Sequence, residues 1–497
     1  MAQDFDIART EIKQHLQASI SNIHISCDMW SSPNGHAFLG IVAHWMDIHH
    51  ILHRGLIALP RIMGAHTGEN IAIVLVDVLE KYNICEKLGY MMLDNATNND
   101  TAVESLDSEL IWRGIIPVIS SEERRLRCFG HILNLVVKEL LFGKDETVLE
   151  TSKDEITAWR KLGPLGKLHN IVRTIRSSPQ RRDRFHAIQI TDQTLKDPTF
   201  MLRQDNDKRW NSTYDMIQLA LQLQEAIDRY IVAAMAESRK SKSKAAERLK
   251  ADLLHAPDWD ELKVLYNLLS PFKELTIELQ GNIVGARMNG AIFDVLPAMD
   301  MLLNTLEDAK LAYKAQKSHF ASCINLAWTK LDEYYNLSDN SPIYVVAVML
   351  DPRLKLQYIE SRWSTHPEWI EIAQEKVRTM FNHYRNKCRS SVPLASISKS
   401  VSISSALMHS ESTFRNWKYG PIAPVPHPEE LDKYSRALLE AEDVAPIDYW
   451  KANKAKYPIL ASMAWDILSI PAMSSEVERV FSGYILKMES LTLVRNS

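Results

Sequence analysis

The chain has 497 residues, of which 46% are apolar and 24% are charged, as in ordinary globular proteins. This composition excludes a disordered chain and a collagen-like fibre, and at about 150 residues per domain the length predicts roughly three units. The 58 basic and 62 acidic residues give a net charge of −4, so any nucleic-acid binding has to come from local patches. Glycine is scarce, at 16 residues, which predicts a chain rich in helices.

The cysteines and the apolar runs bear on the compartment. Five scattered cysteines and a charged N-terminus without an apolar leader predict a reduced, intracellular protein. No apolar run approaches the length of about 18 residues that a membrane-spanning helix needs, so we expect no contact with a membrane.

The first 150 residues alternate between strand and helix signals. Residues 1–20 predict a short amphipathic helix, and Thr67 is expected to cap a later one. The apolar runs predict strands over 23–30, 38–46, 52–59, 89–93 and 126–129, and helices over 71–79 and 131–141. Three strands in a row followed by strand–helix alternation indicate a mixed sheet with helices packed on it.

Strand signals nearly vanish after about residue 155. Helical periodicity runs through segments 214–236, 259–279, 291–314 and 318–335, which predicts a helical domain. The basic segment 238–250 is either a solvated loop or a binding arm. Ser- and Pro-rich stretches at 388–405 and 421–428 predict a linker, and a last helical unit is expected to start near Pro446.

Two aspartates occupy chemically interesting positions. Asp28 lies at the end of the first strand and Asp94 directly follows the fourth. Carboxylates brought together at neighbouring strand ends need a shared proton or a hard divalent cation. The alternative is that each aspartate only caps a helix or starts a turn, as Asp94 followed by Asn95 can.

Further short motifs follow in chain order. Cys128 and His131 form a Cys-x-x-His pair, but no second pair lies at finger spacing, so we expect no structural zinc site. Arg209 and Trp210 precede a long helix. Five arginines at 173, 176, 181, 182 and 184 form either a patch for the DNA backbone or ordinary exposed side chains beside a loop.

Taken together, these motifs resemble the transposases of the hAT superfamily. The matching pieces are Cys27-Asp28-Met29-Trp30-Ser31-Ser32, Leu93-Asp94-Asn95-Ala96, Arg127-Cys128 with His131 and Asn134-Leu135, Arg209-Trp210-Asn211-Ser212-Thr213, Met349-Leu350-Asp351-Pro352-Arg353, and Ser474 to Gly483. Each motif is short, but six of them occur in the family order and span nearly the whole chain.

The resemblance implies an α/β fold with an added all-helical part. In this interpretation an RNase H-like mixed-sheet core is interrupted by a large helical insertion domain. The implied division is an N-terminal helix (1–20), the first part of the core (21–150), the insertion (151–385), a flexible linker (386–430) and a C-terminal hAT dimerisation region that completes the core (431–497).

The family's catalytic triad maps onto Asp28, Asp94 and Glu478. Three such carboxylates hold two Mg²⁺ (or Mn²⁺) ions about 3.5–4 Å apart for cleavage of a phosphodiester and transfer of the strand. Glu476 is a rival for the third position, and Glu478 is otherwise an ordinary surface carboxylate. No zinc is expected in this chain.

The resemblance also assigns contacts with DNA, namely transposon ends and target DNA. His131, with Cys128, is expected near the scissile strand, Arg209 on a phosphate, and Trp210 stacked on an extruded base. Otherwise Trp210 is a core anchor and His131 an ordinary residue at the start of a helix. Arg181 and Arg182 are the basic-patch residues that we expect to contact DNA.

Self-association is the last implied property. Leu460, Met463, Ile467, Leu468 and Phe481 are expected to form a dimerisation face, although the same apolar spacing also fits packing against the core. Family members usually carry an N-terminal BED-type zinc finger and a longer C-terminal region. Neither pattern occurs here, which predicts a truncated copy.

Three functions follow from these expectations. The first is a hAT-type transposase with a metal-dependent DNA-cleaving site. The second is a catalytically incomplete, element-derived protein that acts as a DNA-associated dimerisation module. The third is a standalone RNase H-like nuclease, which leaves the helical insertion and the C-terminal motif unexplained. A DNA substrate predicts a nuclear location.

Overall fold

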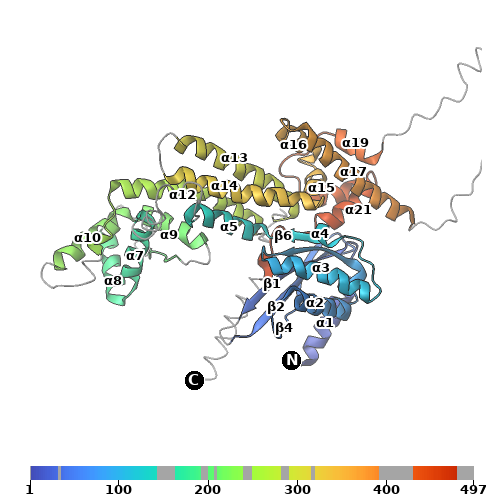
Figure 1. The fold of residues 1–497 in the computed structure, drawn as a ribbon, viewed down its shortest axis with the longest axis horizontal. Coiled ribbons are helices and arrows are strands. Elements are labelled where there is room, and N and C mark those ends of the chain that lie inside the picture. Colours follow the sequence, from blue (N-terminus) through green and yellow to red (C-terminus); the bar gives the residue numbers. More distant parts are fainter. Residues whose placement is uncertain are drawn as a thin grey trace, which may run out of the picture.

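The computed structural model describes residues 2–31, 35–142, 163–191, 200–205, 210–238, 249–280, 290–314, 319–390 and 429–477. Within these ranges the strands form one mixed sheet near the N-terminus (Figure 1). The strands are β1 (Ile23–Ser31), β2 (Ala37–Met46), β3 (Leu52–Ala58), the short β4 (Arg61–Ile62), β5 (Leu88–Leu93) and β6 (Arg125–Arg127).

The sheet has the order β3-β2-β1-β5-β6, with β4 paired to β2. β1, β2 and β3 form an antiparallel meander. β5 is paired in parallel with β1, and β6 is paired in parallel with β5. Every residue of β5 is buried, as expected of a central parallel strand. The predicted mixed sheet is confirmed; β4 was not predicted, and β6 ends two residues earlier than expected.

One face of the sheet is apolar and is covered by two helices. α2 (Gly68–Tyr82) and α3 (Thr97–Trp112) pack there against alternate residues such as Ile25, Ile41 and Met91 (Figure 1). Thr67 caps α2 as predicted, because its side chain accepts a hydrogen bond from Asn70 N. The first helix of the chain, α1 (Ala2–Gln17), agrees with the expected N-terminal helix.

The opposite face of the sheet is partly polar. Because side chains alternate along a strand, His24, Ser26 and Asp28 of β1 all point to this face. Tyr90 and Met92 of β5 share it and belong to the larger apolar core that continues into the helical part of the molecule.

From the sheet a helical arm extends away (Figure 1). Its helices are α5 (Phe129–Phe142), α7 (Pro164–Arg176), α8 (Pro179–Thr191), α9 (Trp210–Gln222), α10 (Gln224–Ser238), α12 (Ala256–Leu279), α13 (Val295–Lys314) and α14 (His319–Leu337). α5, α12, α13 and α14 run side by side, and α7 to α10 lie at the far end. The single helix predicted over 214–236 is divided between α9 and α10 at Leu223.

The chain then returns to the sheet as a second group of helices. These are α15 (Ile343–Leu350), α16 (Lys355–Arg362), α17 (Pro367–Ser390), α19 (Glu430–Arg436), α20 (Pro446–Asn453) and α21 (Pro458–Ile467). α21 contacts α15, α17, α20 and β2. α20 begins at Pro446 as predicted, and α17 continues five residues into the segment predicted as a linker; residues 391–428 lie outside the described ranges.

None of the helices in the described part of the chain is long and apolar enough to cross a membrane.

Candidate active site

Asp28 and Asp94 lie on adjacent parallel strands. β1 and β5 are paired with Ile25 beside Met91 and Ser26 beside Met92. Two residues further along this register, Asp28 is beside Asp94, and neighbouring strands are about 4.8 Å apart. The sheet therefore brings together two carboxyl groups between which β2, β3, β4, α2 and β5 lie in the sequence.

The carboxylates are half-buried and held by nearby amides. Asp28 Oδ1 accepts a hydrogen bond from Met29 N at 2.9 Å. Asp94 Oδ1 accepts from Ala96 N at 2.9 Å and from Asn99 Nδ2 at 2.5 Å, which makes Asp94 the first residue of a turn before α3. Asp94 therefore starts a turn, as the alternative interpretation predicted, and it also lies beside Asp28.

Cys128 and His131 meet at the start of α5. The Cys128 N–H donates to Leu93 O at 2.8 Å, which places the beginning of α5 directly after the end of β5. Burial acts to raise the pKa of the Cys128 thiol, but hydrogen bonds with His131 and Ser474 outweigh it and lower the pKa. His131 and Ser474 thus favour the thiolate form of Cys128.

His131 is electrostatically coupled to both aspartates. Burial acts to lower its pKa, but the contact with Cys128 and the charges of Asp94 and Asp28 outweigh burial and raise the pKa to about 9. The imidazole is therefore protonated at neutral pH. A cation, a thiol and two carboxylates thus meet at one edge of the sheet, and perturbed groups of this kind gather at functional sites.

The C-terminal segment is bound to this edge by its backbone. Phe129 N donates to Ala472 O at 3.1 Å, and Ser474 N donates to Cys128 Sγ at 3.2 Å. Further along, Val477 is fully buried against Val42 of β2. Val42 is paired with Ser26, so Val477 lies on the same face of the sheet as Asp28.

The rival third carboxylate, Glu476, is bound elsewhere. Its Oε1 lies 2.5 Å from Arg54 Nη1 on β3. Glu478 lies outside the described residues, so the third position of the predicted triad is not placed. Within the described ranges no group of three or more His, Cys, Asp or Glu side chains is arranged to hold a metal.

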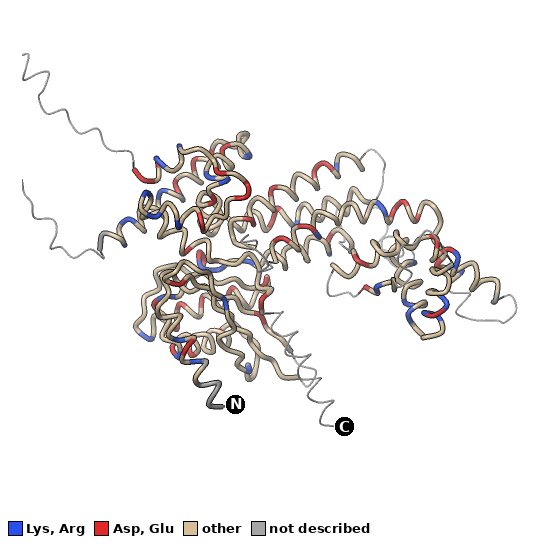
Figure 2. Tube along the Cα trace, turned by 180° about the vertical axis from the view of Figure 1, so that it is seen from behind, with Lys and Arg blue, Asp and Glu red and all other residues tan. Residues whose placement is uncertain are grey.

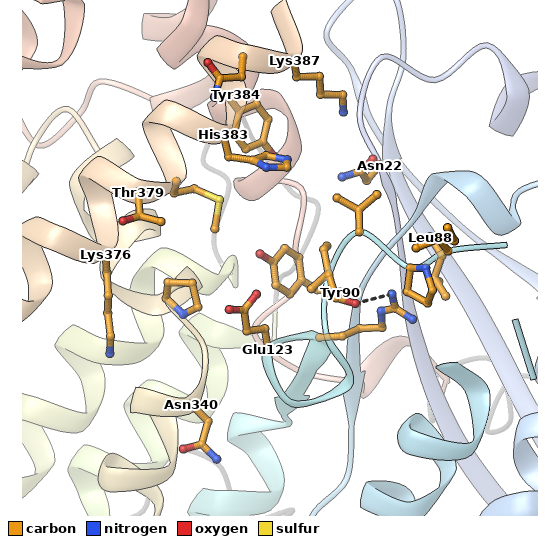
Figure 3. Close-up of a pocket in the computed structure, with 18 of the residues that line it drawn as sticks. Asn22, Leu88, Tyr90, Glu123, Asn340, Lys376, Thr379, His383, Tyr384 and Lys387 are labelled. Carbon is orange, nitrogen blue, oxygen red and sulfur yellow. Dashed lines mark hydrogen bonds between the residues drawn. The ribbon is translucent and has the colours of Figure 1, made fainter. Parts of the chain in front are cut away.

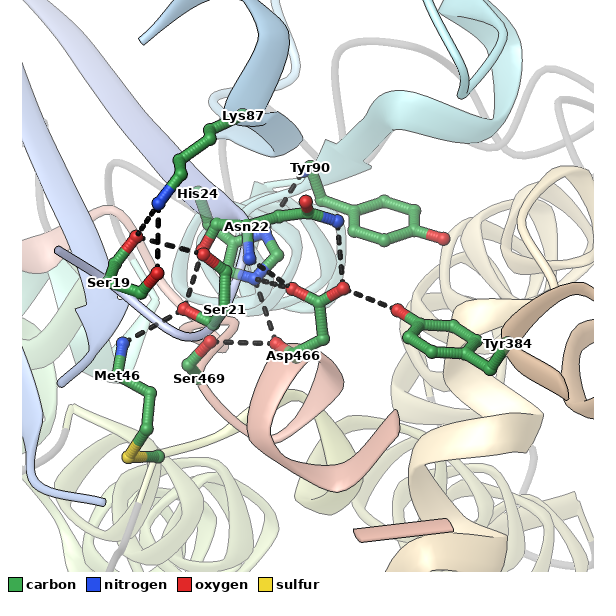
Figure 4. Close-up of polar contacts among 10 residues, drawn as sticks. All are labelled: Ser19, Ser21, Asn22, His24, Met46, Lys87, Tyr90, Tyr384, Asp466 and Ser469. Atoms are coloured by element: carbon green, nitrogen blue, oxygen red, sulfur yellow. Dashed lines mark hydrogen bonds and ion pairs between the residues drawn. The ribbon is translucent and has the colours of Figure 1, made fainter. Parts of the chain in front are cut away.

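A different aspartate, Asp466 of α21, forms hydrogen bonds at the amino end of β1, opposite to the end at which Asp28 lies (Figure 4). Its carboxylate accepts hydrogen bonds from Asn22 N at 2.6 Å, from Asn22 Nδ2 at 2.7 Å and from the Tyr384 hydroxyl. Its backbone oxygen lies 2.8 Å from His24 Nε2. Sequence reasoning missed Asp466; the available signal was a lone acidic residue on the apolar face of the predicted C-terminal helix.

Gly89 on β5 is required by this arrangement. A Cβ atom at residue 89 would lie 2.5 Å from Nδ1 of the His24 ring, too close for any side chain. The same ring nitrogen accepts a hydrogen bond from Tyr90 N at 3.0 Å. The His24 imidazole is thus wedged between β5 and α21.

Trp210 is buried at the start of α9, with 4% of its surface exposed. Its ring centroid lies 6.5 Å from that of Tyr214 and 6.4 Å from that of Phe272, both edge-on. In this structure Trp210 is a core anchor, and stacking on an extruded base would require the indole to leave this cluster. Arg209 lies outside the described residues.

The predicted basic patch lies at the far end of the arm, where several Lys and Arg residues gather (Figure 2). Arg181 is half-buried, and its Nη1 donates to Thr174 O at 3.3 Å and to Ser177 Oγ at 2.6 Å. Arg182 is also half-buried. Arg181 therefore closes the turn between α7 and α8, in addition to any contact with DNA.

The predicted dimerisation residues on α21 are occupied within the chain. Leu460, Met463, Ile467 and Leu468 each have at most 1% of their surface exposed and belong to the main core. This face of α21 therefore packs against the core of the same chain, which was the alternative interpretation. Phe481 lies outside the described residues.

The Asp351-Pro352-Arg353 motif is structural here. Asp351 is fully buried, and its carboxylate accepts two hydrogen bonds from the Arg353 guanidinium, at 2.8 Å to Nε and 2.6 Å to Nη2. This paired arrangement connects α15 to the chain that follows it.

Four family sequence models match successive parts of the chain. They are the ZBED1 RNase-like domain at residues 26–117, the ZBED1 RNase-like helical domain at 126–256, the RNase-H fold of hAT-like transposases at 299–384, and the hAT family C-terminal dimerisation region at 430–493. The RNase-like match begins two residues before Asp28 and includes Asp94.

Similar proteins cover almost the whole chain at low identity. The Talaromyces stipitatus protein named "Putative transcriptional regulator tpeD" is 27% identical over 93% of this chain and 50% of its own length. The Zea mays protein named "Putative AC transposase" is 25% identical over 93% of the chain and 53% of its own length. The Oryza sativa "Zinc finger BED domain-containing protein RICESLEEPER 3" is 20% identical over 96% of this chain and 59% of its own length.

The chain spans about half the length of the first two of these relatives. Its ordered sheet, the paired aspartates and the four matching family models agree with the resemblance found in the motifs. The chain thus carries the hAT family C-terminal dimerisation region and the RNase-H fold of hAT-like transposases, and it is homologous to AC transposases and to BED-finger proteins.

Proposed function

We propose that this protein is a metal-dependent DNA strand transferase whose active site is formed by Asp28, Asp94 and Glu478. The observation that carries the proposal is the register of β1 and β5, which aligns Asp28 with Asp94, together with the effect of both charges on His131. In this proposal the RNase H-like core is split by the helical arm, and the segment after α21 returns to complete it.

The two placed carboxylates fit a hard divalent cation. Asp28 and Asp94 supply oxygen donors only, on adjacent strands and partly open to solvent, which suits Mg²⁺ or Mn²⁺. When bound, a pair of such ions lowers the pKa of an attacking hydroxyl and stabilises the leaving oxygen of a phosphodiester. Val477 on the Asp28 face of the sheet supports Glu478, the next residue, as the third ligand.

The protein's own side chains position the DNA. Protonated His131 offers a fixed cation beside the carboxylates, where it attracts a phosphate of the scissile strand. Cys128 favours the charged form of the imidazole, and Ser474 N in turn donates a hydrogen bond to Cys128 Sγ. Arginines at the tip of the arm, Arg181 and Arg182 among them, add contacts with the DNA backbone far from the chemistry.

Self-association and location follow from the same assignment. The C-terminal dimerisation region supports a homo-oligomer, and because the described face of α21 is buried within the chain, other surfaces of this region would contact the second copy. Transposon ends and target DNA are the proposed DNA partners, which places the protein in the nucleus.

The direct test is cleavage of a labelled DNA duplex by the purified chain in Mg²⁺ or Mn²⁺. We expect Asp28→Asn and Asp94→Asn each to reduce nicking to the level of buffer alone, because each removes one charged oxygen ligand. Asp260→Asn is the matched control, since Asp260 is exposed on α12 and its ion pair among the described residues is with Lys263 on the same helix. Its nicking activity should equal that of the parent chain.

Binding separates the two main functions. Equal nicking by the parent chain and Asp28→Asn would refute the proposed triad. Absence of nicking by the parent chain, combined with tight, salt-dependent DNA binding, would instead establish the alternative, a catalytically incomplete protein that acts as a DNA-associated dimerisation module.

A further inference from the structure

A groove of about 1000 Å³ lies between α17 and the amino ends of β1 and β5 (Figure 3). Asn22, just before β1, and Leu88, the first residue of β5, line it. Asp28 and Asp94 lie at the opposite ends of the same strands. The groove is therefore separate from the proposed active site.

One wall of the groove is a continuous stripe along α17. Lining residues recur every three or four positions from Glu371 and Ile372 to Lys387, which is the spacing of one helix face. At 1.5 Å per residue this stripe is about 24 Å long, or more than four helical turns. An elongated wall of this kind fits a helix laid along it better than a compact small molecule.

The groove is apolar at its rim. Ile116 and Val118, in the loop between α3 and α4 (Ser121–Arg124), are 85% and 74% exposed, and Ile372 on the facing α17 is 54% exposed. Three large aliphatic side chains thus face solvent on both sides of one depression. Exposed apolar side chains gathered around a cavity are typical of a site of protein interaction.

The floor carries a polar group without a partner. Tyr90 is 4% exposed, yet its hydroxyl has no hydrogen bond to the described residues and points into the groove (Figure 3). Burial raises the pKa of this phenol, so the hydroxyl remains a neutral donor. Because the hydroxyl opens into the groove, an occupant can accept a hydrogen bond from it.

The charges around the groove are unbalanced. Lys376 is paired with Asp339 at 3.1 Å, and Arg124 is bound to Asp107. Three lining carboxylates, Glu86, Glu123 and Glu371, form no ion pair with any residue that the structure describes. With Lys387 as a third cation and five lining carboxylates in all, the groove has a net negative lining beside apolar surface.

We propose that this groove binds a basic amphipathic helix of a partner protein. Ile116, Val118 and Ile372 would receive the apolar stripe of the helix, and the three carboxylates would pair with lysines or arginines that flank the stripe. The Tyr90 hydroxyl would donate to an oxygen of the bound helix. The proposal concerns recruitment of another protein and does not depend on the proposed catalytic function.

The test uses the full chain and a fluorescein-labelled helical peptide of about sixteen residues, four turns, with a leucine stripe flanked by lysines. Fluorescence anisotropy should show saturable binding that weakens with salt. Ile372→Asp and Ile116→Asp should each reduce the affinity at least tenfold. Ile277→Asp is the matched control, because Ile277 on α12 is also 54% exposed but lies outside the groove, and its affinity should equal that of the parent.

Two further variants examine the polar part of the site. Replacing Glu86, Glu123 and Glu371 together by glutamine should weaken binding and flatten its salt dependence. Tyr90→Phe should lower the affinity several-fold while the melting temperature stays unchanged, because the hydroxyl has no partner to lose in the free chain.

Three results would overturn the proposal. One is equal binding of a peptide in which the lysines are replaced by glutamates. Another is unchanged affinity in Ile372→Asp and Ile116→Asp. The third is a change in the oligomeric state of the chain alone in Ile116→Asp, measured by sedimentation velocity, which would assign this surface to a contact between two copies.

Discussion

Aspartates lie at both ends of the paired strands β1 and β5, but their environments differ. At the amino end, Asp466 is 4% exposed, and its carboxylate accepts two hydrogen bonds from Asn22 and one from Tyr384. At the carboxyl end, Asp28 and Asp94 are half-buried beside each other and influence His131 through their charges.

This contrast distinguishes a structural carboxylate from a candidate catalytic one. A buried charge is tolerated when every oxygen is satisfied by the protein, as at Asp466. Two neighbouring carboxylates near solvent repel each other, and a bound cation relieves this repulsion. Burial and hydrogen-bond saturation, rather than residue type, therefore identify the end of the sheet at which chemistry is expected.

The largest expected effect comes from removing the structural carboxylate. Asp466→Ala should lower the free energy of unfolding by about 3 kcal/mol, because it leaves one buried donor of Tyr384 and two partly buried donors of Asn22 without their acceptor. Chemical denaturation followed by circular dichroism measures the change. The control is Asp448→Ala, an exposed residue of α20 whose nearest cation, Lys451, is 3.7 Å away; it should cost less than about 0.5 kcal/mol. Equal losses in the two variants would contradict the role assigned to Asp466.

The next effect concerns the titration of His131. Its folded pKa of about 9 lies above the ordinary value of 6.5, so the protonated ring stabilises the fold fully below pH 6.5 and loses this contribution as the pH rises through about 9. Cys128→Ala should lower the His131 pKa by more than one unit, or about 1.4 kcal/mol, and Asp28→Asn should lower it by less.

Nuclear magnetic resonance of the His131 ring, in buffer with a metal chelator, gives these pKa values. The exposed His366 provides the control titration in the same samples, because its partner Glu368 lies on the surface, 3.4 Å away. An unchanged His131 pKa in Asp28→Asn would mean that the aspartate and the imidazole are not neighbours.

The smallest effect is expected at the ion pair that binds the C-terminal segment to β3. Arg54→Gln removes the partner of Glu476, and because both side chains are partly exposed, we expect a loss of less than about 1 kcal/mol in global stability. Hydrogen exchange should nevertheless become faster around Val477, since local opening is cheaper than global unfolding. Unchanged exchange there would show that the ion pair contributes nothing to holding the segment.

The sequence predicted the sheet and its two aspartates because these signals are local. Apolar alternation located β1, β2, β3 and β5 within one or two residues, and the Thr67 cap located the start of α2. The break at Leu223 was not predicted, because apolar residues continue through it at helical spacing. β4 is only two residues long and leaves no periodic pattern.

The site was only partly predictable for a different reason. The joining of Asp28 to the C-terminal region rested on family motifs, since no periodicity connects residues that far apart. The contact between Asn22 and Asp466 spans 444 positions and has no local signature. Trp210 shows the limit of a motif: the residue type matches the family, but the ring lies within the core.

The bond between Asn22 and Asp466 also has a consequence for biosynthesis. β1 emerges from the ribosome first, and the carboxylate that binds its amino end follows 444 residues later. At about 5–20 residues per second, this interval is on the order of 20–90 s. During that time the polar face of the nascent sheet, with His24 and Ser26, lacks its final cover. The sheet therefore cannot complete its native core before α21 has been synthesised.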